Sequence, residues 1–264
     1  MSKYWEIFKV TWQGLIIYRV NFMMWRIRTV LQLLLVYFIW WSVFQARDEV
    51  FGYTTTAIIT YVLIAALIRA IVMGTKVTDL IDSINTGRVV NFLIKPIGFV
   101  RYYLTREAAD KLFNIIFFII EISIIFFLLK PPLFIQTDIL NWVLFLFAIS
   151  GALIISFCIN FLISLTAFWL EYSWGVLFLM SIFLESLGGG LFPIDILPKS
   201  LFSILMLTPF PYLIYFPAKL YLGSMGITEI ATGFSVTFVW IIILVFLTRK
   251  VLNAGFRHFS SVGH

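Results

Sequence analysis

Cysteine, histidine and charge are all scarce in this chain. One cysteine (Cys158) and two histidines (His258 and His264) occur among 264 residues, and 12% of the residues are charged. A single cysteine excludes an intrachain disulfide and a cluster of metal-binding thiolates. With so little charge and 62% hydrophobic residues, the composition excludes a water-soluble domain and indicates a protein that crosses the membrane several times.

Motifs for nucleotide hydrolysis and for common hydrolytic chemistry are also missing. The sequence contains no G-x-x-x-x-G-K-[ST] phosphate loop, no serine nucleophile elbow and no H-E-x-x-H zinc site. We therefore expect no catalytic residue, no metal and no cofactor on this chain. Hydrolysis of ATP by this chain alone is excluded.

What the chain has instead is long apolar stretches, of which six approach the length of about 20 residues needed to cross a bilayer. They are approximately Thr29–Phe44, Thr54–Met73, Leu112–Leu129, Trp142–Trp169, Gly175–Phe192 and Ala231–Leu247. The sequence therefore predicts an all-α membrane protein with six transmembrane helices.

Lysine and arginine are unevenly distributed between these stretches. Most of them fall in residues 1–28, 74–111 and 249–257, which share one side of the membrane if both termini do. Because positive residues are retained on the cytoplasmic side, we expect both termini to be cytoplasmic in a multi-pass protein of the cell inner (plasma) membrane. The net charge of +6 is then a topological bias, and it does not indicate a nucleic-acid partner.

The N-terminal segment, residues 1–28, has the pattern of a helix lying in the membrane interface. Lys3, Glu6, Lys9 and Gln13 recur at spacings of three and four among aromatic and aliphatic residues. Such a helix either anchors the chain to membrane lipids or binds a partner, and the sequence does not decide between these roles.

The polar loop of residues 74–111 is long enough to hold structure of its own. Val77, Leu80, Ile81 and Ile84 follow a helical spacing, with Asp79, Asp82 and Ser83 on the opposite face and Gly87 as a stop. A second short helix is expected to start near Phe99. These helices either rest on the bilayer or dock on a cytoplasmic partner.

Residues 187–223 are strongly apolar yet hold five of the eight prolines, which oppose a straight spanning helix. The run Gly188, Gly189 and Gly190 permits a sharp reversal of the chain. We expect either a re-entrant hairpin at membrane depth after the fifth span or a loop lying among the headgroups on the extracytoplasmic side.

Three ionisable residues fall inside the expected spans: Arg69, Glu121 and Glu185. A charge at the centre of a span costs roughly 3 kcal/mol, but many apolar neighbours each return roughly 0.3–0.6 kcal/mol, so the third span tolerates Glu121. The two acids have no histidine or lysine at a diagnostic spacing. They are interpreted as interior polar contacts or cavity lining, with proton carriage as the alternative, and Arg69 as a side chain that extends to the interface.

Two motifs and the tail resemble a known family. Ile84–Pro96 (INTGRVVNFLIKP) is similar to a Gly-x-x-x-x-x-Leu-x-[Lys/Arg]-Pro loop, and Gly188–Leu201 (GGGLFPIDILPKSL) to a Gly-x-x-x-Pro-x-x-x-x-Pro run after span five. The tail, with Gly255 and Phe259, is similar to a closing Gly-x-x-x-Tyr pattern, with phenylalanine in place of tyrosine. Over nearly its whole length, as a single domain of residues 1–264, the chain resembles the permease subunits of ABC-2 type transporters that have six spans and no fused ATPase.

This resemblance implies partners. Two permeases, identical or related, would sit on two separately encoded nucleotide-binding ATPase subunits, and ATP and Mg would bind only those subunits. The loop of residues 74–111 would couple ATPase closure to the spans, and spans one, two and five would line the pathway. The residues implied for coupling are Thr75, Val77, Asp79, Leu80, Ile81, Ile84, Gly87 and Arg88.

The resemblance also implies an external gate in the hairpin after span five. Its residues would be Gly188, Gly189, Gly190, Phe192, Pro193 and Pro198. The expected function is export of an amphipathic or hydrophobic small molecule, such as a drug, a toxin or a lipid-like compound. The alternatives are an ion-coupled secondary transporter, which would place ionisable residues in paired spans, and an intramembrane enzyme or assembly factor.

Overall fold

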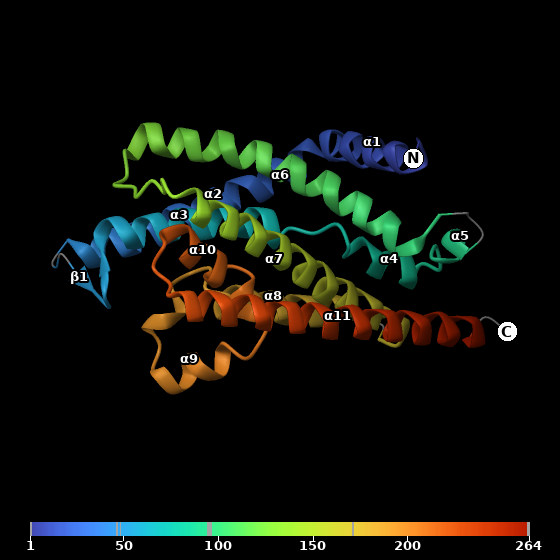
Figure 1. Ribbon diagram of the computed structural model, residues 1–264. Helices are drawn as coiled ribbons and strands as arrows, with labels where there is room; N and C mark the ends of the chain where they lie inside the picture. Colours follow the sequence, from blue (N-terminus) through green and yellow to red (C-terminus); the bar gives the residue numbers. More distant parts are fainter. Residues whose placement is uncertain (1, 46, 48, 94–96, 171, 263–264) are drawn as a thin grey trace.

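The computed structural model describes residues 2–45, 47, 49–93, 97–170 and 172–262, and these residues form an elongated, predominantly helical bundle (Figure 1). Within this part of the chain, five helices are long and apolar enough to cross a membrane. They are α2 (Arg19–Phe44), α3 (Thr55–Val72), α6 (Phe99–Leu129), α7 (Ile139–Leu165) and α11 (Ile227–Val262). The expected membrane protein is therefore confirmed at the level of an all-helical chain with several potential spans.

The fifth of the six expected spans, Gly175–Phe192, is represented by the shorter helix α8 (Ser173–Leu187). Its 15 residues extend about 22 Å, less than the roughly 30 Å of a hydrocarbon core. It stops at Gly188 because three consecutive glycines weaken a helix. That this fifth segment crosses the membrane, which would make six crossings in all, thus stays a prediction.

Helix α6 corrects one boundary of the sequence analysis. A helix does begin at Phe99 as expected, but it continues without a break through the expected third span, so that the two form a single helix of 31 residues. No glycine or proline interrupts this sequence. The helix ends at Lys130, which has a left-handed φ of 44° and is followed by Pro131 and Pro132.

The N-terminal segment is divided between two helices. Helix α1 (Ser2–Ile17) packs beside α6, with the ring of Trp12 edge-on to that of Phe113 at 5.1 Å. Helix α2 begins at Arg19, so residues 19–28 belong to the first long helix and not to a single interfacial helix of residues 1–28. The interfacial role of α1 remains a prediction.

The loop between α3 and α6 contains the expected amphipathic helix, α4 (Asp79–Asn85), and one further turn, α5 (Val90–Leu93). Gly87 has a φ of +71°, which favours glycine and ends α4 where the sequence analysis placed a stop. Lys95 and Pro96 of the predicted loop motif lie outside the described residues, as does His264. Figure 1 shows α4 and α5 at the same end of the bundle as both termini.

At the opposite end lie a small hairpin, β1 (Glu49–Val50) paired with β2 (Tyr53–Thr54), and the broken segment after α8 (Figure 1). This segment consists of η2 (Ile194–Ile196), α9 (Lys199–Leu205), η3 (Phe210–Tyr212) and α10 (Tyr215–Leu222). Prolines precede or begin η2, α9 and η3, which explains why no long helix forms. We call this the hairpin end and the opposite one the α4 end.

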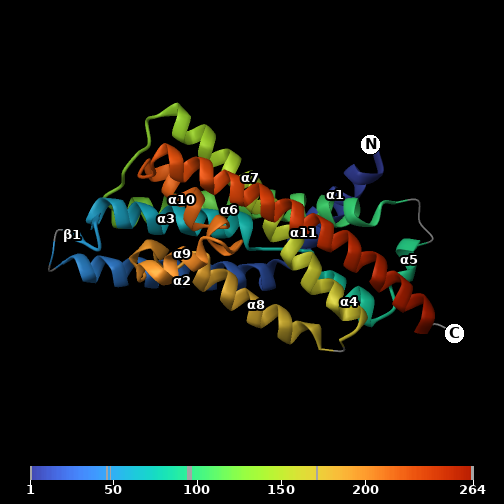
Figure 2. The same cartoon turned by 60° about the horizontal axis from the view of Figure 1, so that its bottom comes forward.

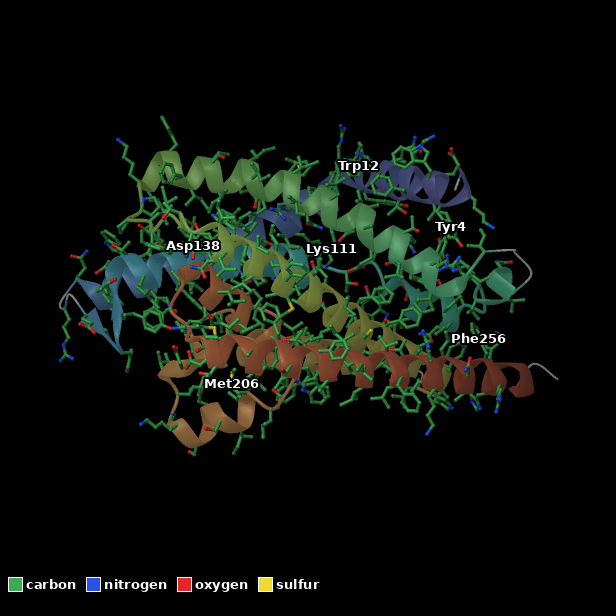
Figure 3. The ribbon with its side chains drawn as sticks, viewed as in Figure 1. Tyr4, Trp12, Lys111, Asp138, Met206 and Phe256 are labelled. Carbon is green, nitrogen blue, oxygen red and sulfur yellow. The ribbon has the colours of Figure 1, made fainter. Side chains whose placement is uncertain are left out.

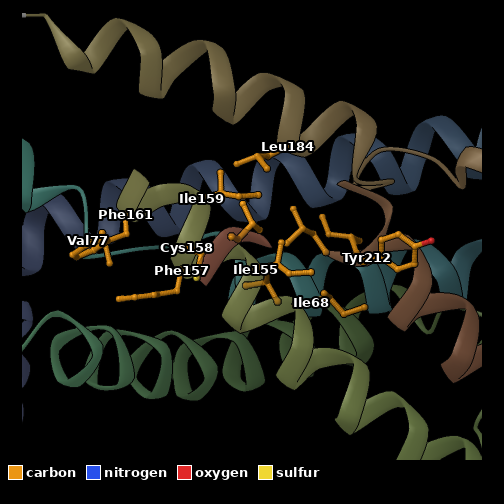
Figure 4. Close-up of a cluster of buried hydrophobic side chains, with 14 of the residues drawn as sticks. Ile68, Val77, Ile155, Phe157, Cys158, Ile159, Phe161, Leu184 and Tyr212 are labelled. Atoms are coloured by element: carbon orange, nitrogen blue, oxygen red, sulfur yellow. The ribbon is translucent and has the colours of Figure 1, made fainter. Parts of the chain in front are cut away.

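The core is organised around α7, which packs against α3, α10 and α11 and, with the following turn η1 (Thr166–Phe168), against α4. Figure 4 shows its buried side chains, among them Ile155 and Phe161, meeting Ile68 of α3 and Val77 beside α4. Ser156 donates a hydrogen bond to the carbonyl oxygen of Val72 at 2.7 Å, which secures the end of α3 to α7. Helix α10 is buried throughout its first seven residues, so the broken segment is part of the core.

Candidate functional site

Polar side chains meet at one junction inside the bundle, where α2, α3 and α8 come together. Glu185 of α8 accepts hydrogen bonds through its Oε1 atom from Arg69 Nη1 of α3 and from Gln32 Nε2 of α2, each at 2.5 Å. Figure 2 shows α8 on the same side of the bundle as α2. We call Gln32, Arg69 and Glu185 the three-helix junction.

The environment of the junction explains how two charges are tolerated there. The side chain of Arg69 is 10% exposed and that of Glu185 is 30% exposed, so the guanidinium is enclosed and the carboxylate keeps one open side. An ion pair within a membrane protein is neutral overall, and its partners satisfy one another's hydrogen bonds. Arg69 thus pairs inside the bundle instead of extending to the interface as the sequence analysis suggested.

A second ion pair joins α2 to α6. Arg26 donates through Nε to Glu121 Oε1 at 2.5 Å and through Nη2 to Oε2, and its Nη1 reaches Asn114 Oδ1 at 3.3 Å. This two-pronged contact is the strongest geometry that arginine and a carboxylate adopt. Beside it lies a groove of about 310 Å³ whose other walls are mainly apolar, including Ile27 and Phe117.

Helix α2 is consequently held by polar contacts at two levels, Arg26 to α6 and Gln32 to α8. Breaking one partner of a buried pair typically costs about 3–5 kcal/mol, because the other charge is left without compensation. Both contacts agree with the interior polar role that the sequence analysis assigned to Glu121 and Glu185. The alternative role in proton carriage is not tested by them.

At the α4 end, a buried pair on α6 holds the start of the loop. Glu107 Oε2 accepts hydrogen bonds from Thr75 Oγ1 at 2.8 Å and from the backbone N–H of Lys76 at 2.9 Å. Lys111, labelled in Figure 3, lies 3.1 Å from Glu107 and donates to the carbonyl oxygens of Val72 and Gly74. Lys111 thereby satisfies the carbonyl group of Val72, the last residue of α3, and that of Gly74 in the loop after it; we call the contacts of Glu107 and Lys111 the loop latch.

The predicted coupling residues divide into two sets according to burial. Their apolar members are fully or almost fully buried against α7 and η1; they are Val77, Leu80, Ile81 and Ile84. Asp79 is bound to Arg106 of α6 at 2.5 Å. Arg88 is exposed, as are Asp82 and Asn85 of α4, so the polar face is the one that remains accessible.

The predicted gate residues also lie in a packed setting. Gly189 has a φ of +86°, and its carbonyl oxygen accepts a hydrogen bond from Tyr61 Oη at 2.7 Å. A Cβ atom at this position would lie 2.7 Å from Tyr61 Oη and 2.9 Å from Tyr215 Cβ. The three glycines thus join α8 to α3 and α10 at close range, which is the physical reason for a glycine at position 189.

The remaining gate residues frame the start of the broken segment. Gly188 accepts a backbone hydrogen bond from Tyr215 at 2.9 Å. Phe192 packs against the cluster formed by α2 and α3, Pro193 is buried before η2, and Pro198 is the exposed residue before α9. The structure therefore gathers the predicted gate residues in one region, at the hairpin end.

Sequence reasoning missed Gln32 and Arg26 as site residues. Gln32 lies within an expected span, and a single amide there gives no signal by spacing. Arg26 was assigned to the interfacial segment because it precedes the apolar stretch that starts at Thr29. The available signal was the helical phase. Residues six apart lie on different faces of a helix, so Arg26 and Gln32 reach different neighbouring helices.

Comparison with known proteins agrees with this architecture. The family model described as "ABC-2 family transporter protein" matches residues 30–263. Searches of curated proteins and of solved structures gave no match. The family match spans α3 to α11 and most of α2, and the chain therefore belongs to the ABC-2 family of transporter membrane proteins.

Proposed function

We propose that this protein is the permease subunit of an ATP-driven exporter, which pairs with a second permease and is driven by separate ATPase subunits that bind ATP and Mg. Its cargo is an amphipathic or hydrophobic compound that leaves the cytoplasm. The observation that carries the proposal is the three-helix junction. Gln32, Arg69 and Glu185 lie on the three helices that correspond to spans one, two and five, the spans to which the resemblance assigns the pathway.

The arrangement of the ends supports the proposed topology. Both termini share the α4 end with the basic loop (Figure 1), as a protein with cytoplasmic termini requires. In this orientation the hairpin end, with the predicted gate, faces away from the cytoplasm across the inner membrane.

Helix α4 is suited to receive a movement from an ATPase subunit. Its apolar face is buried against α7 and η1, whereas Asp82, Asn85 and Arg88 remain exposed. A partner that contacts this polar face would shift α4 together with its packed neighbours, and it acts only through a difference in affinity for two arrangements of the permease. The loop latch and the Asp79–Arg106 pair would carry that shift to α6.

The chemistry of the groove supports an apolar cargo. Its volume of about 310 Å³ and its mainly apolar walls next to Arg26 and Glu121 suit a hydrophobic group better than a glycan, which needs many polar partners. Helix α2 contributes residues to both the groove and the three-helix junction. A compound that moves along this helix would therefore contact both.

The test is co-purification with the ATPase subunit followed by reconstitution into vesicles. The double variant Asp82→Lys with Arg88→Glu reverses the exposed charges on α4 and just after it. It leaves the buried apolar residues unchanged and removes the hydrogen bond from Trp174 Nε1 of α8 to Asp82 Oδ1. We expect it to insert and fold normally but to lose at least tenfold of the bound ATPase and of ATP-dependent export. Lys199→Glu, an exposed change at the hairpin end, is the matched control and should retain both.

Three results would contradict the proposal. They are transport by the purified permease without an ATPase, uptake driven by a proton gradient alone, and unchanged ATPase binding by the double variant. Product formation from a lipid substrate would instead support an intramembrane enzyme.

A further inference from the structure

A pocket of about 290 Å³ lies at the hairpin end, apart from the junction and the groove. It is lined by the turn between β1 and β2, the start of α3, η2 and α10, and it is open on one side. Its volume lies at the lower limit of small-molecule sites, which range from about 300 to 1,000 Å³. The pocket is therefore large enough for a small polar group such as a lipid headgroup.

The floor of the pocket carries one charge of each sign. Lys219 Nζ donates to Asp195 Oδ2 and to Tyr53 Oη, both at 3.1 Å, and Tyr53 Oη donates to the same carboxylate at 2.8 and 2.9 Å. Burial raises the pKa of the Tyr53 phenol, and the charge of Asp195 adds to this effect, so the phenol keeps its proton. An ammonium has three N–H donors, and these two contacts engage two of them.

The rim of the pocket is aromatic, and one of its rings is held by an unfavourable backbone. Phe51 is 64% exposed with a φ of +56°, and Gly52 follows with a φ of +78°. These two residues form the turn of the hairpin, a position at which Asn-Gly is preferred because both φ angles are positive. A bulky residue in this conformation is rare and points to a functional reason for its side chain.

These features define the chemistry of a ligand. A cationic group would find Asp195 and the exposed ring of Phe51, since ammonium groups bind both carboxylates and aromatic faces. An anionic group would find the remaining donor of Lys219. Phe134, 40% exposed on the same rim, adds an apolar contact of the kind found beside the membrane surface.

We propose that this pocket binds an amino-phosphate zwitterion, the headgroup of an ethanolamine phospholipid in the leaflet next to the hairpin end. The ammonium lies toward Asp195 and Phe51, and the phosphate toward Lys219. The same chemistry is present in free phosphoethanolamine, which is the soluble source to be distinguished. The proposal is independent of the cargo and of the ATPase partner.

The first experiment uses the wild-type protein in detergent and measures retained lipid by native mass spectrometry. Phosphatidylethanolamine and phosphatidylglycerol with identical acyl chains are offered in equal amounts. We expect at least fivefold preferential retention of the ethanolamine lipid, and we expect free phosphoethanolamine at millimolar concentration to compete with it. At equal concentrations, a larger rise in the melting temperature with the lipid than with free phosphoethanolamine assigns the site to lipid, and a larger rise with the free compound assigns it to the soluble source.

The second experiment separates binding from folding. Lys219→Met and Asp195→Asn remove one charge each and should lower the preference for ethanolamine lipid at least fivefold, whereas Lys199→Met, on the exposed surface of α9, should leave it unchanged. Phe51→Asn creates the preferred Asn-Gly turn, so it should keep or raise the melting temperature while weakening lipid retention. If Phe51 had only a structural role, a variant with an unchanged or higher melting temperature would not lose lipid retention.

Equal retention of the two lipids by the wild-type protein overturns the proposal. The proposal is also overturned if Phe51→Asn and either of the two charge variants each keep the wild-type preference for ethanolamine lipid. If Lys219→Met fails to fold, the wild-type competition and Phe51→Asn decide the question.

Discussion

The two ends of the bundle use buried charges in different ways. At the α4 end, the loop latch of Glu107 and Lys111 binds the backbone of a loop that joins two regular helices, and a polar face of α4 remains exposed. At the hairpin end, Lys219 and Asp195 connect short, proline-broken elements, and α10 is itself buried. The difference is that buried charges at the α4 end hold a loop and leave a polar face exposed, whereas those at the hairpin end hold short elements that belong to the core.

The largest effect is expected at the three-helix junction, where side chains of α2, α3 and α8 are bonded to one another. Arg69→Met leaves Glu185 without its ionic partner and should destabilise the protein by about 3–5 kcal/mol. The double variant Arg69→Met with Glu185→Met should recover much of this loss because no uncompensated charge remains. Thermal or denaturant unfolding in one detergent measures all three proteins, and an additive double variant would show that the pair does not interact.

The packing at the hairpin end is tested at Gly189. Gly189→Ala places a Cβ atom against Tyr61 and Tyr215 at a positive φ and should cost about 3 kcal/mol. Gly175→Ala in α8 is the matched control, since its Cβ meets nothing within 4 Å, and it should be neutral or stabilising by up to about 1 kcal/mol. If the two variants have the same melting temperature, the glycine run is not a packed junction.

The loop latch at the α4 end is expected to show a smaller effect. Thr75→Val keeps the shape of the side chain but removes the hydroxyl that donates to Glu107 and accepts from the N–H of Val77, at a cost of about 1–3 kcal/mol. Thr105→Val, whose hydroxyl makes a solvent-exposed hydrogen bond to the carbonyl oxygen of Arg101 within α6, should change stability by less than about 0.5 kcal/mol. Proteolysis of the loop of residues 74–98 provides a second readout, because loosening of the latch should speed cleavage there and leave the hairpin end intact.

Local elements were predictable from the sequence where spacing alone decides the structure. The helix of Asp79–Asn85 follows from apolar residues three and four apart, and its stop follows from a glycine at position 87. The start of α6 at Phe99 was also found. Its continuity with the expected third span was not, because the charged residues between Arg101 and Lys111 resemble those of a surface loop.

The candidate site itself was only partly predictable. Glu121 and Glu185 were recognised as unusual, but their arginine partners are 95 and 116 residues away, and such pairings depend on which helices become neighbours. The same reason applies to Asp195 and Lys219, which are polar residues in an apolar segment and meet only once the broken segment after α8 is folded. The burial of α10 was hidden because a broken, proline-rich run has the composition of a loop.

The uninterrupted course of α6 has a mechanical consequence. Over 31 residues it is about 46 Å long, and a tilt of about 5° at one tip displaces the other by roughly 4 Å, about three quarters of one helical pitch. The two prolines after Lys130 stop the helix abruptly, and the N–H of Phe134 binds Thr60 Oγ1 of α3 at 2.8 Å just beyond them. A small rocking of this lever near Glu107 would therefore arrive, amplified, at the hairpin end of the bundle.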